Sequence, residues 1–200
     1  MKQMLSAPWF YQAFHRILGT SNLRSHYVNH FVQPKAKEVI VDIGCGPADI
    51  LNYLGEVHYI GIDYNLEYIE QARKRWPNAE FHHAGVDSLQ NLDLPKADCV
   101  MANAVLHHLN DAQALNLYRA SARLMGAESR FCTMDNFISD EQHFISRYLI
   151  MNDRGQHVRS PDAYSALCSD RFIVEKREVR EDLLRVPYSI VMLRYRLKEI

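Results

Sequence analysis

The sequence has almost no net charge and no long apolar stretch. Its 200 residues hold 23 Lys and Arg against 24 Asp and Glu, with the two signs interspersed, so it lacks the basic face that binds a nucleic-acid backbone. No stretch approaches the ~18 apolar residues of a membrane span, and the N-terminus MKQMLSAPWF has no apolar region of signal-peptide length. These absences predict a cytoplasmic protein that binds neither nucleic acid nor a membrane.

Cysteine is scarce and scattered. Cys45, Cys99, Cys132 and Cys168 form no CxxC pair and stand in apolar surroundings, where a free thiol behaves as a small hydrophobe. We therefore expect reduced thiols, as in a cytosolic protein. The chain also has no repeat and no low-complexity linker, and 48% of its residues are apolar. This composition predicts one domain over residues 1–200 with a sizeable core.

Strand-like and helix-like segments alternate through most of the chain. Strands are expected at 38–44, 57–63, 79–85, 97–103 and 129–137, and helices at 48–54, 66–76, 111–126 and 160–168. Such alternation implies parallel strands with right-handed crossovers. The last two extended runs, 172–180 and 186–197, are joined by a short loop and must pair antiparallel. The sequence predicts a three-layer α/β sheet of about seven strands, mostly parallel with a C-terminal antiparallel hairpin.

Two segments lie outside this alternation. Residues 1–33 contain an aromatic-rich amphipathic stretch from 7 to 31 that breaks at Gly19, which predicts two helices forming an N-terminal lid. Residues 137–160 follow the fifth strand without joining it directly to the next helix. Because an insertion at the carboxyl end of a sheet typically covers a site, we expect this segment to be a cap.

The stretch VIVDIGCGPADIL places Gly44 and Gly46 in the turn after the first strand, which is the usual ligand cradle of a doubly wound sheet. Two glycines so close together let the backbone approach a ligand. The phosphate loop GxxxxGK[ST] is absent, and Asp49 stands where a dinucleotide fingerprint has its third glycine. A carboxylate there would repel a pyrophosphate. The turn therefore favours a ligand that contains an adenosine but no phosphate. An acidic residue at the end of the strand would suit such a ligand if it also carries an ammonium group.

The motif VxVDIGCGPAD resembles motif I of the class I S-adenosylmethionine-dependent methyltransferases, in the small bacterial type of the type 11 and 12 subgroup. The resemblance extends over roughly residues 37–136 and implies a Rossmann-like fold with S-adenosyl-L-methionine as cofactor. It places Asp42, Gly44, Cys45 and Gly46 at the cofactor. Ala48 departs from the family pattern, where glycine is commoner, and is expected to shift the start of the following helix.

The same resemblance gives roles to four residues on the next strands. Asp63, 21 residues after Asp42, resembles the acid that accepts both ribose hydroxyls, and Tyr64 would lie against the adenine. Asp87 resembles the acid that accepts from the adenine amino group, and Asn103 would face the methionine part. Taken alone, Asp63 is equally a turn residue. For Asp87, beside Ser88, a helix cap is the weaker alternative.

Methyl transfer needs a base only when the accepting group carries a proton that must leave. His107 and His108 follow the fourth strand, and Asp135 ends the fifth. In some O-methyltransferases resembling this subgroup, a histidine of the LHH segment and an acid after strand five form a base dyad. A carboxylate on one imidazole nitrogen raises basicity at the other. A structural histidine bonded to backbone explains either histidine equally well, and a metal site is the weaker alternative, because adjacent histidines rarely point the same way.

Residues outside the sheet are expected to select the acceptor. Tyr11 and Phe14, with their aromatic neighbours, would form a lid over the sulfonium, although ordinary helix packing explains such residues too. Arg154 and Arg159 would meet an acidic group on the acceptor or remain solvated at the surface.

We therefore expect a methyltransferase that acts on an oxygen of a small molecule, as a monomer or homodimer without a metal. The alternatives are an N-methyltransferase that works by positioning alone, a non-catalytic S-adenosylmethionine-binding protein and an oxidoreductase on a truncated dinucleotide fold.

Overall fold

The computed structural model describes residues 19–153, 155–168 and 170–198. Seven strands form one sheet in the order β3-β2-β1-β4-β5-β7-β6. These strands are β1 (Val39–Ile43), β2 (His58–Asp63), β3 (Glu80–His83), β4 (Ala97–Asn103), β5 (Met125–Asn136), β6 (Phe172–Arg180) and β7 (Ile190–Leu197).

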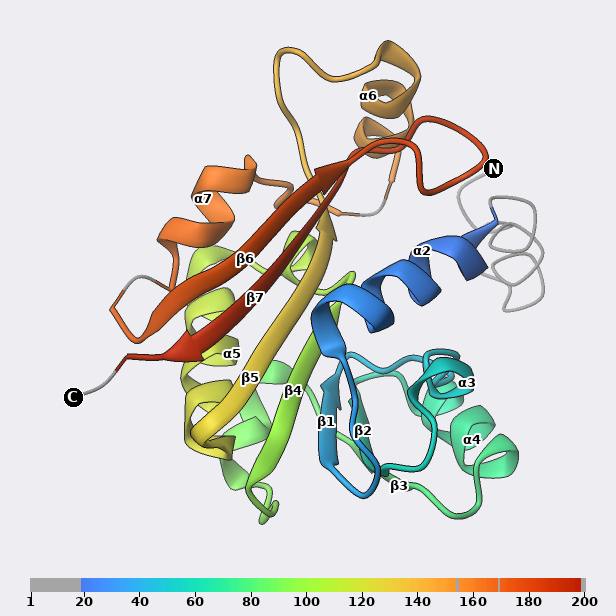
Figure 1. The fold of residues 1–200 in the computed structure, drawn as a ribbon, viewed down its shortest axis with the longest axis vertical. Helices are drawn as coiled ribbons and strands as arrows, with labels where there is room; N and C mark the ends of the chain where they lie inside the picture. The colour runs from blue at the N-terminus through green and yellow to red at the C-terminus, as the bar shows by residue number, and fades with distance from the viewer. Residues whose placement is uncertain (1–18, 154, 169, 199–200) are drawn as a thin grey trace.

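The first five strands are parallel, and β7 runs antiparallel to both β5 and β6. The chain places β6 at the edge of the sheet first and then inserts β7 between β6 and β5 (Figure 1). This arrangement confirms the predicted α/β sheet, mostly parallel with an antiparallel hairpin at its C-terminal end. The predicted strands coincide with the observed ones to within a few residues.

Helices cover both faces of the sheet, which gives the predicted three layers. α2, α3 and α4 lie on one side, α5 and α7 on the other, and α6 stands beyond the end of β5 (Figure 1). No helix in the described ranges is long and apolar enough to cross a membrane. The helices are α2 (Thr20–Tyr27), α3 (Leu51–Leu54), α4 (Leu66–Arg75), α5 (Asp111–Leu124), α6 (Phe144–Met151) and α7 (Pro161–Ala166).

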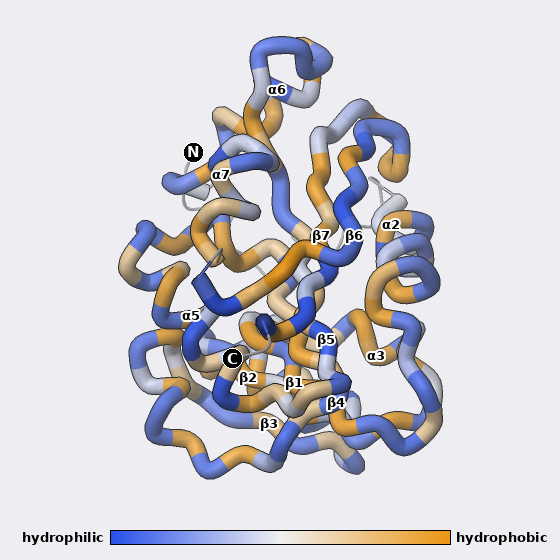
Figure 2. The backbone as a smooth tube through the Cα atoms, turned by 60° about the vertical axis from the view of Figure 1, so that its left-hand side comes forward, coloured by the Kyte–Doolittle hydropathy of each residue, from blue (hydrophilic) through white to orange (hydrophobic). Residues whose placement is uncertain are grey.

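Each face of the sheet has its own hydrophobic core, because side chains alternate along the strands. In β1, Val41 and Ile43 pack with α5, whereas Ile40 packs with Tyr27 and Phe31 on the other face. Strands buried on both faces read as continuous apolar runs. Residues 190–193 of β7 form such a run and are buried, while the edge strand β6 is mainly hydrophilic after its first three residues (Figure 2). Charged side chains on an edge strand hinder pairing with another chain.

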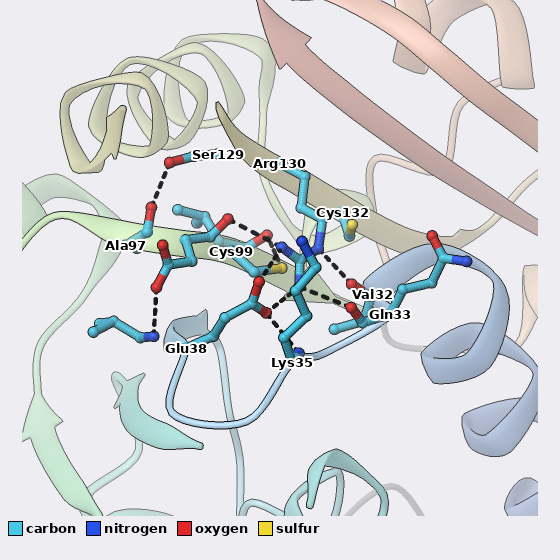
Figure 3. Close-up of polar contacts among 12 residues, drawn as sticks. Val32, Gln33, Lys35, Glu38, Ala97, Cys99, Ser129, Arg130 and Cys132 are labelled. Carbon is cyan, nitrogen blue, oxygen red and sulfur yellow. Dashed lines mark hydrogen bonds and ion pairs between the residues drawn. The ribbon is translucent and has the colours of Figure 1, made fainter. Parts of the chain in front are cut away.

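A buried arginine joins the N-terminal segment to the amino end of the sheet (Figure 3). Arg130 Nη2 donates to Glu38 Oε2 at 2.6 Å and to the Gln33 carbonyl at 3.3 Å, and Arg130 Nε donates to the Val32 carbonyl. Burial raises the pKa of Glu38, but the hydrogen bonds from Arg130 and Lys35 N and the positive charges of these two residues together outweigh it, so this pKa lies below its usual value. The chain therefore enters β1 from a fixed position.

Several helix boundaries differ from the sequence prediction by a few residues, and two of these differences have a clear cause. α5 ends at Leu124 rather than Gly126, because Met125 already pairs with Ala97 as the start of β5. α3 begins at Leu51, whereas the prediction started this helix at Ala48. Ala48 has a φ of 55°, a left-handed conformation that no residue inside a right-handed helix adopts. The expected shift of the helix start at Ala48 is thus observed.

Candidate active site

Several of the predicted cofactor residues lie at one edge of the sheet. Strand order reverses between β1 and β4, and the carboxyl ends of strands at such a point are where open α/β sheets bind ligands. The turn after β1 lies there and is tied to β2, since Gly44 N and Cys45 N both donate to the Ile62 carbonyl, at 2.7 and 3.1 Å. The turn therefore has a fixed position between the ends of β2 and β4.

The two glycines of this turn have different surroundings. Gly44 has a φ of 77°, and a Cβ there would lie 2.2 Å from Val105 Cγ2 in the loop after β4. Gly46 also has a positive φ, 54°, but a Cβ there would meet nothing within 4 Å. Gly44 thus allows two loops of the chain to touch, whereas Gly46 faces open space. An open position beside exposed backbone is suited to a ligand.

Asp63 ends β2 and is held by backbone donors on both sides. Its Oδ2 accepts from Gly46 N and its Oδ1 from Asn65 N, each at 2.8 Å. Burial raises the pKa of Asp63, and the two backbone hydrogen bonds oppose that rise. Each carboxylate oxygen retains a lone pair beyond these bonds. The structure thus fixes Asp63 directly beside the glycine turn, as the sequence predicted.

Asp42 lies beneath the same turn and is 2% exposed. Tyr59 donates its hydroxyl to Asp42 Oδ2 at 2.7 Å. Burial raises the pKa of Asp42 to about 7, opposed by the hydrogen bond from Tyr59 and reinforced by the nearby charge of Asp63. Asp42 therefore changes charge near neutral pH when the site holds no cation.

Four buried oxygens along this edge lack a hydrogen-bond partner within the described part of the chain. They are Asp42 Oδ1, Asn103 Oδ1, Asp135 Oδ2 and Asn136 Oδ1. Leaving a buried acceptor unpaired costs roughly 1–3 kcal/mol. All four belong to the last residues of β1, β4 or β5. This edge is therefore rich in acceptors that a ligand with N–H or ammonium donors would satisfy.

The structure brings His107 and Asp135 together. His107 Nδ1 lies 2.8 Å from Asp135 Oδ1, and the His107 backbone N–H donates to the same oxygen at 3.2 Å. His107 is 4% and Asp135 3% exposed. Burial raises the pKa of Asp135, and His107 opposes the rise. Asp135 faces Nδ1, so Nε2 is the ring nitrogen that does not face this carboxylate.

His108 takes a different orientation. Its side chain is exposed, and its ring is tilted 44° from that of His107 with the centroids 4.0 Å apart. The two adjacent histidines thus divide into one buried residue paired with Asp135 and one surface residue.

The segment after β5 returns to the turn that carries His107. A Cβ on Gly155 would lie 2.4 Å from His107 Cδ2, and His157 N donates to the His107 carbonyl at 2.9 Å. Arg159 Nη1 donates to the Leu106 carbonyl at 2.9 Å. Residues 155–159 therefore cover the buried histidine, in the region where the sequence predicted a cap.

Some predicted site residues lie away from these contacts. Tyr64 is 78% exposed. Asp87 is exposed in a 3₁₀ turn after β3, where its Oδ1 accepts from Asn116 of α5 at 3.4 Å. Cys45 is buried in the turn, where its thiol donates to the Gly46 carbonyl. Tyr11, Phe14 and Arg154 lie outside the described residues.

Arg159 has its donors occupied by the chain itself. Its Nε and Nη2 donate to Asp111 Oδ1 at 3.1 and 2.7 Å, and Nη2 also donates to the Leu109 carbonyl at 2.7 Å. The hollow of about 410 Å³ that Arg159 borders is lined by α5 and α7 rather than by the glycine turn. These contacts give Arg159 an anchoring role.

Sequence reasoning missed three residues of this region. Val105 fills the space above Gly44, Tyr59 donates to Asp42, and Gly155 contacts His107. The Val105 and Gly155 contacts join segments far apart in sequence, so no local pattern indicates them. For Gly155, the sequence offered one indication of a close contact: a glycine within a predicted cap of mostly bulky residues.

Comparison with known families agrees with this geometry. Residues 40–127 match the family model described as a methyltransferase domain. This match covers less than half of the chain and agrees with the resemblance to methyltransferases seen in the sequence. The matched residues include the glycine turn, Asp63 and His107, and the predicted resemblance to a methyltransferase domain is confirmed.

Individual methyltransferases resemble the chain over larger spans. Trans-aconitate 2-methyltransferase of Rhodopseudomonas palustris strain BisB5 is 28% identical over 154 residues, which are 75% of this chain and 57% of that protein. The chain spans between 28% and 57% of the length of the curated relatives it matches first.

Two solved structures share the fold. The pyocyanin biosynthetic protein PhzM has a TM-score of 0.72 at 17% identity, over 96% of this chain and 60% of that one. N-methyltransferase NodS from Bradyrhizobium japonicum WM9, solved with S-adenosyl-L-homocysteine, has a TM-score of 0.65 at 15% identity, over 98% of this chain and 91% of that one.

Proposed function

We propose that this chain is an S-adenosylmethionine-dependent methyltransferase that methylates an oxygen of a small molecule, with His107 and Asp135 as its base pair. The observation that carries the proposal is the 2.8 Å contact between His107 Nδ1 and Asp135 Oδ1. It lies at the strand edge that also holds the glycine turn and Asp63. A base and a cofactor cradle on one edge are what methylation of a hydroxyl requires.

The residues of the edge fit the cofactor. Asp63 offers two oxygens to the vicinal ribose hydroxyls, while its backbone partners Gly46 and Asn65 hold it in place. The unpaired oxygens of Asp42 and Asn103 offer acceptors to the ammonium of the methionine part. Gly46 leaves room for the cofactor to lie against the backbone.

When bound, S-adenosylmethionine supplies the methyl group on an already activated sulfonium. The chain therefore has to position the acceptor and remove its proton. Asp135 orients the His107 ring through Nδ1 and stabilises the positive charge that the ring gains, while Nε2 takes the hydroxyl proton. Residues 155–159 pack beside the ring and bond to the His107 carbonyl. A general base of this kind typically contributes ~10²–10⁴ in rate.

One observation favours a second function, methyl transfer by positioning alone. Asp135 Oδ1 also accepts the backbone N–H of His107, which is what a purely structural pair would do. Relatives named for methylation of trans-aconitate point to carboxylates, which are already deprotonated at neutral pH and need no base.

A screen with radiolabelled S-adenosylmethionine tests the activity. Phenols, alcohols, amines and carboxylates, trans-aconitate among them, are offered as acceptors, and calorimetry compares S-adenosylmethionine with NAD. We expect cofactor binding without NAD binding, and label transferred to a hydroxyl. Binding without transfer to any acceptor would contradict catalysis, and transfer only to amines or carboxylates would favour positioning alone.

A further inference from the structure

We propose that Gly155 is a positioning residue for His107: only a residue without a side chain lets residues 155–159 close on the ring while Nδ1 stays on Asp135. Its catalytic consequence rests on the proposed function. The contact between Gly155 and His107 does not rest on that function, because it concerns only the packing of residues 155–159, called the cap below, against the imidazole ring.

The geometry leaves no room for a methyl group. A Cβ on Gly155 would lie 2.4 Å from His107 Cδ2, 3.2 Å from Cγ and 3.2 Å from the His107 carbonyl oxygen. Ordinary contact begins at 3.4 Å, so the ring or the cap backbone would have to move by about 1 Å. Cδ2 adjoins Nε2 in the ring, so Gly155 lies beside the nitrogen proposed to take the proton.

Hydrogen bonds hold the cap on both sides of this contact. On one side, Asp153 Oδ2 accepts from Asn136 Nδ2 and from the Tyr188 hydroxyl, each at 3.2 Å. On the other, His157 N donates to the His107 carbonyl at 2.9 Å, and Arg159 donates to the carbonyl groups of Leu106 and Leu109.

We expect the imidazole ring to move rather than the cap. The ring makes one side-chain hydrogen bond, Nδ1 to Asp135 Oδ1, whereas several hydrogen bonds hold the cap. A methyl at position 155 would therefore displace the ring from Asp135. A displacement of about 1 Å is enough to cost ~10²-fold in rate when it affects a reacting group.

Gly155→Ala tests this inference, with Gly126→Ala as the matched control. Neither glycine has a positive φ, and a Cβ at Gly126 would lie 3.7 Å from Ser129 Oγ, an ordinary contact at the opposite end of β5. We expect Gly155→Ala to lower kcat about 10- to 100-fold with the S-adenosylmethionine Kd within about twofold. Gly126→Ala should behave as wild type.

Two readouts do not depend on methyl transfer. The ring ¹⁵N signals of His107, identified by their loss in His107→Ala, should shift in Gly155→Ala. In urea unfolding, Gly155→Ala should lower the midpoint by roughly 1 M in the wild-type background and much less in His107→Ala, where no ring opposes the methyl. If Gly155→Ala alone does not fold, the double variant Gly155→Ala with His107→Ala should fold, because the ring that opposes the methyl group is absent.

Equal effects of Gly155→Ala in both backgrounds, or unchanged His107 signals, would overturn the proposal, as would a wild-type kcat. A separate experiment tests the proposed base: wild-type turnover in His107→Ala would show that His107 is not the base.

Discussion

Replacement of Asp42 by asparagine tests the electrostatics beneath the glycine turn. Asp42 is 2% exposed, has one unpaired oxygen and has a pKa raised by burial from 3.8 to about 7. The folded protein therefore keeps this proton over a pH range in which the unfolded chain loses it. Folding is favoured by the proton at low pH, and this contribution is lost as the pH rises from about 4 to about 7.

The size of the effect follows from the shift. At 1.36 kcal/mol for each pKa unit, the ionised carboxylate lowers the free energy of unfolding by about 4 kcal/mol above pH 7, of which about 3 kcal/mol is lost between pH 5 and pH 8. Asparagine keeps an acceptor for Tyr59 and does not titrate. The free energy of unfolding of Asp42→Asn, relative to wild type, should therefore rise by about 3 kcal/mol over this interval.

Urea unfolding at pH 5 and pH 8 measures this difference. Asp98→Asn serves as the control, because Asp98 is exposed and accepts a hydrogen bond from Val39 N at 2.8 Å. Its pH dependence should match that of wild type. A difference between wild type and Asp42→Asn that is the same at both pH values would refute the reasoning.

Three further substitutions test the site and its support. Gly44→Ala should weaken S-adenosylmethionine binding at least tenfold by calorimetry, since its Cβ would lie 2.2 Å from Val105 Cγ2; Val105→Ala should restore part of the affinity, and full affinity in Gly44→Ala alone would contradict the assignment. Asp63→Ala should raise the cofactor Kd at least about tenfold by removing two charge-assisted acceptors; a change under twofold in a folded variant would mean that the carboxylate serves only the backbone. Arg130→Met should lower the free energy of unfolding by roughly 1–3 kcal/mol, because the Val32 carbonyl loses its donor and half-buried Glu38 is left with the hydrogen bond from Lys35 N; an unchanged urea midpoint would argue against that anchor.

The sheet was predictable because its strands carry long apolar runs and end at polar residues. β4 was predicted with its observed limits. α6 was not predicted from the sequence, since its buried face holds Ser146 and Ile150 while Phe144 and Tyr148 are 74% and 68% exposed. A helix that exposes its large apolar residues reverses the pattern on which helix prediction depends.

Some contacts of the candidate site were likewise predictable from the sequence, and others were not. The contact between His107 and Asp135 was predictable, because the carboxyl ends of adjacent parallel strands meet at one edge of the sheet. The surroundings of Asp87 and Arg159 were not, because their partners Asn116 and Asp111 both lie on α5, and nothing in the sequence specifies how that helix approaches the loops. The contact between Gly155 and His107 likewise depends on the path of the cap.

The most direct test of the central claim is the turnover of His107→Ala at saturating S-adenosylmethionine with a hydroxyl acceptor from the screen, compared with His108→Ala. The proposed base predicts that kcat falls ~10²–10⁴-fold in His107→Ala, with the cofactor Kd within a few-fold of wild type and with His108→Ala close to wild type. Undiminished turnover in His107→Ala would contradict the base and favour methyl transfer by positioning alone.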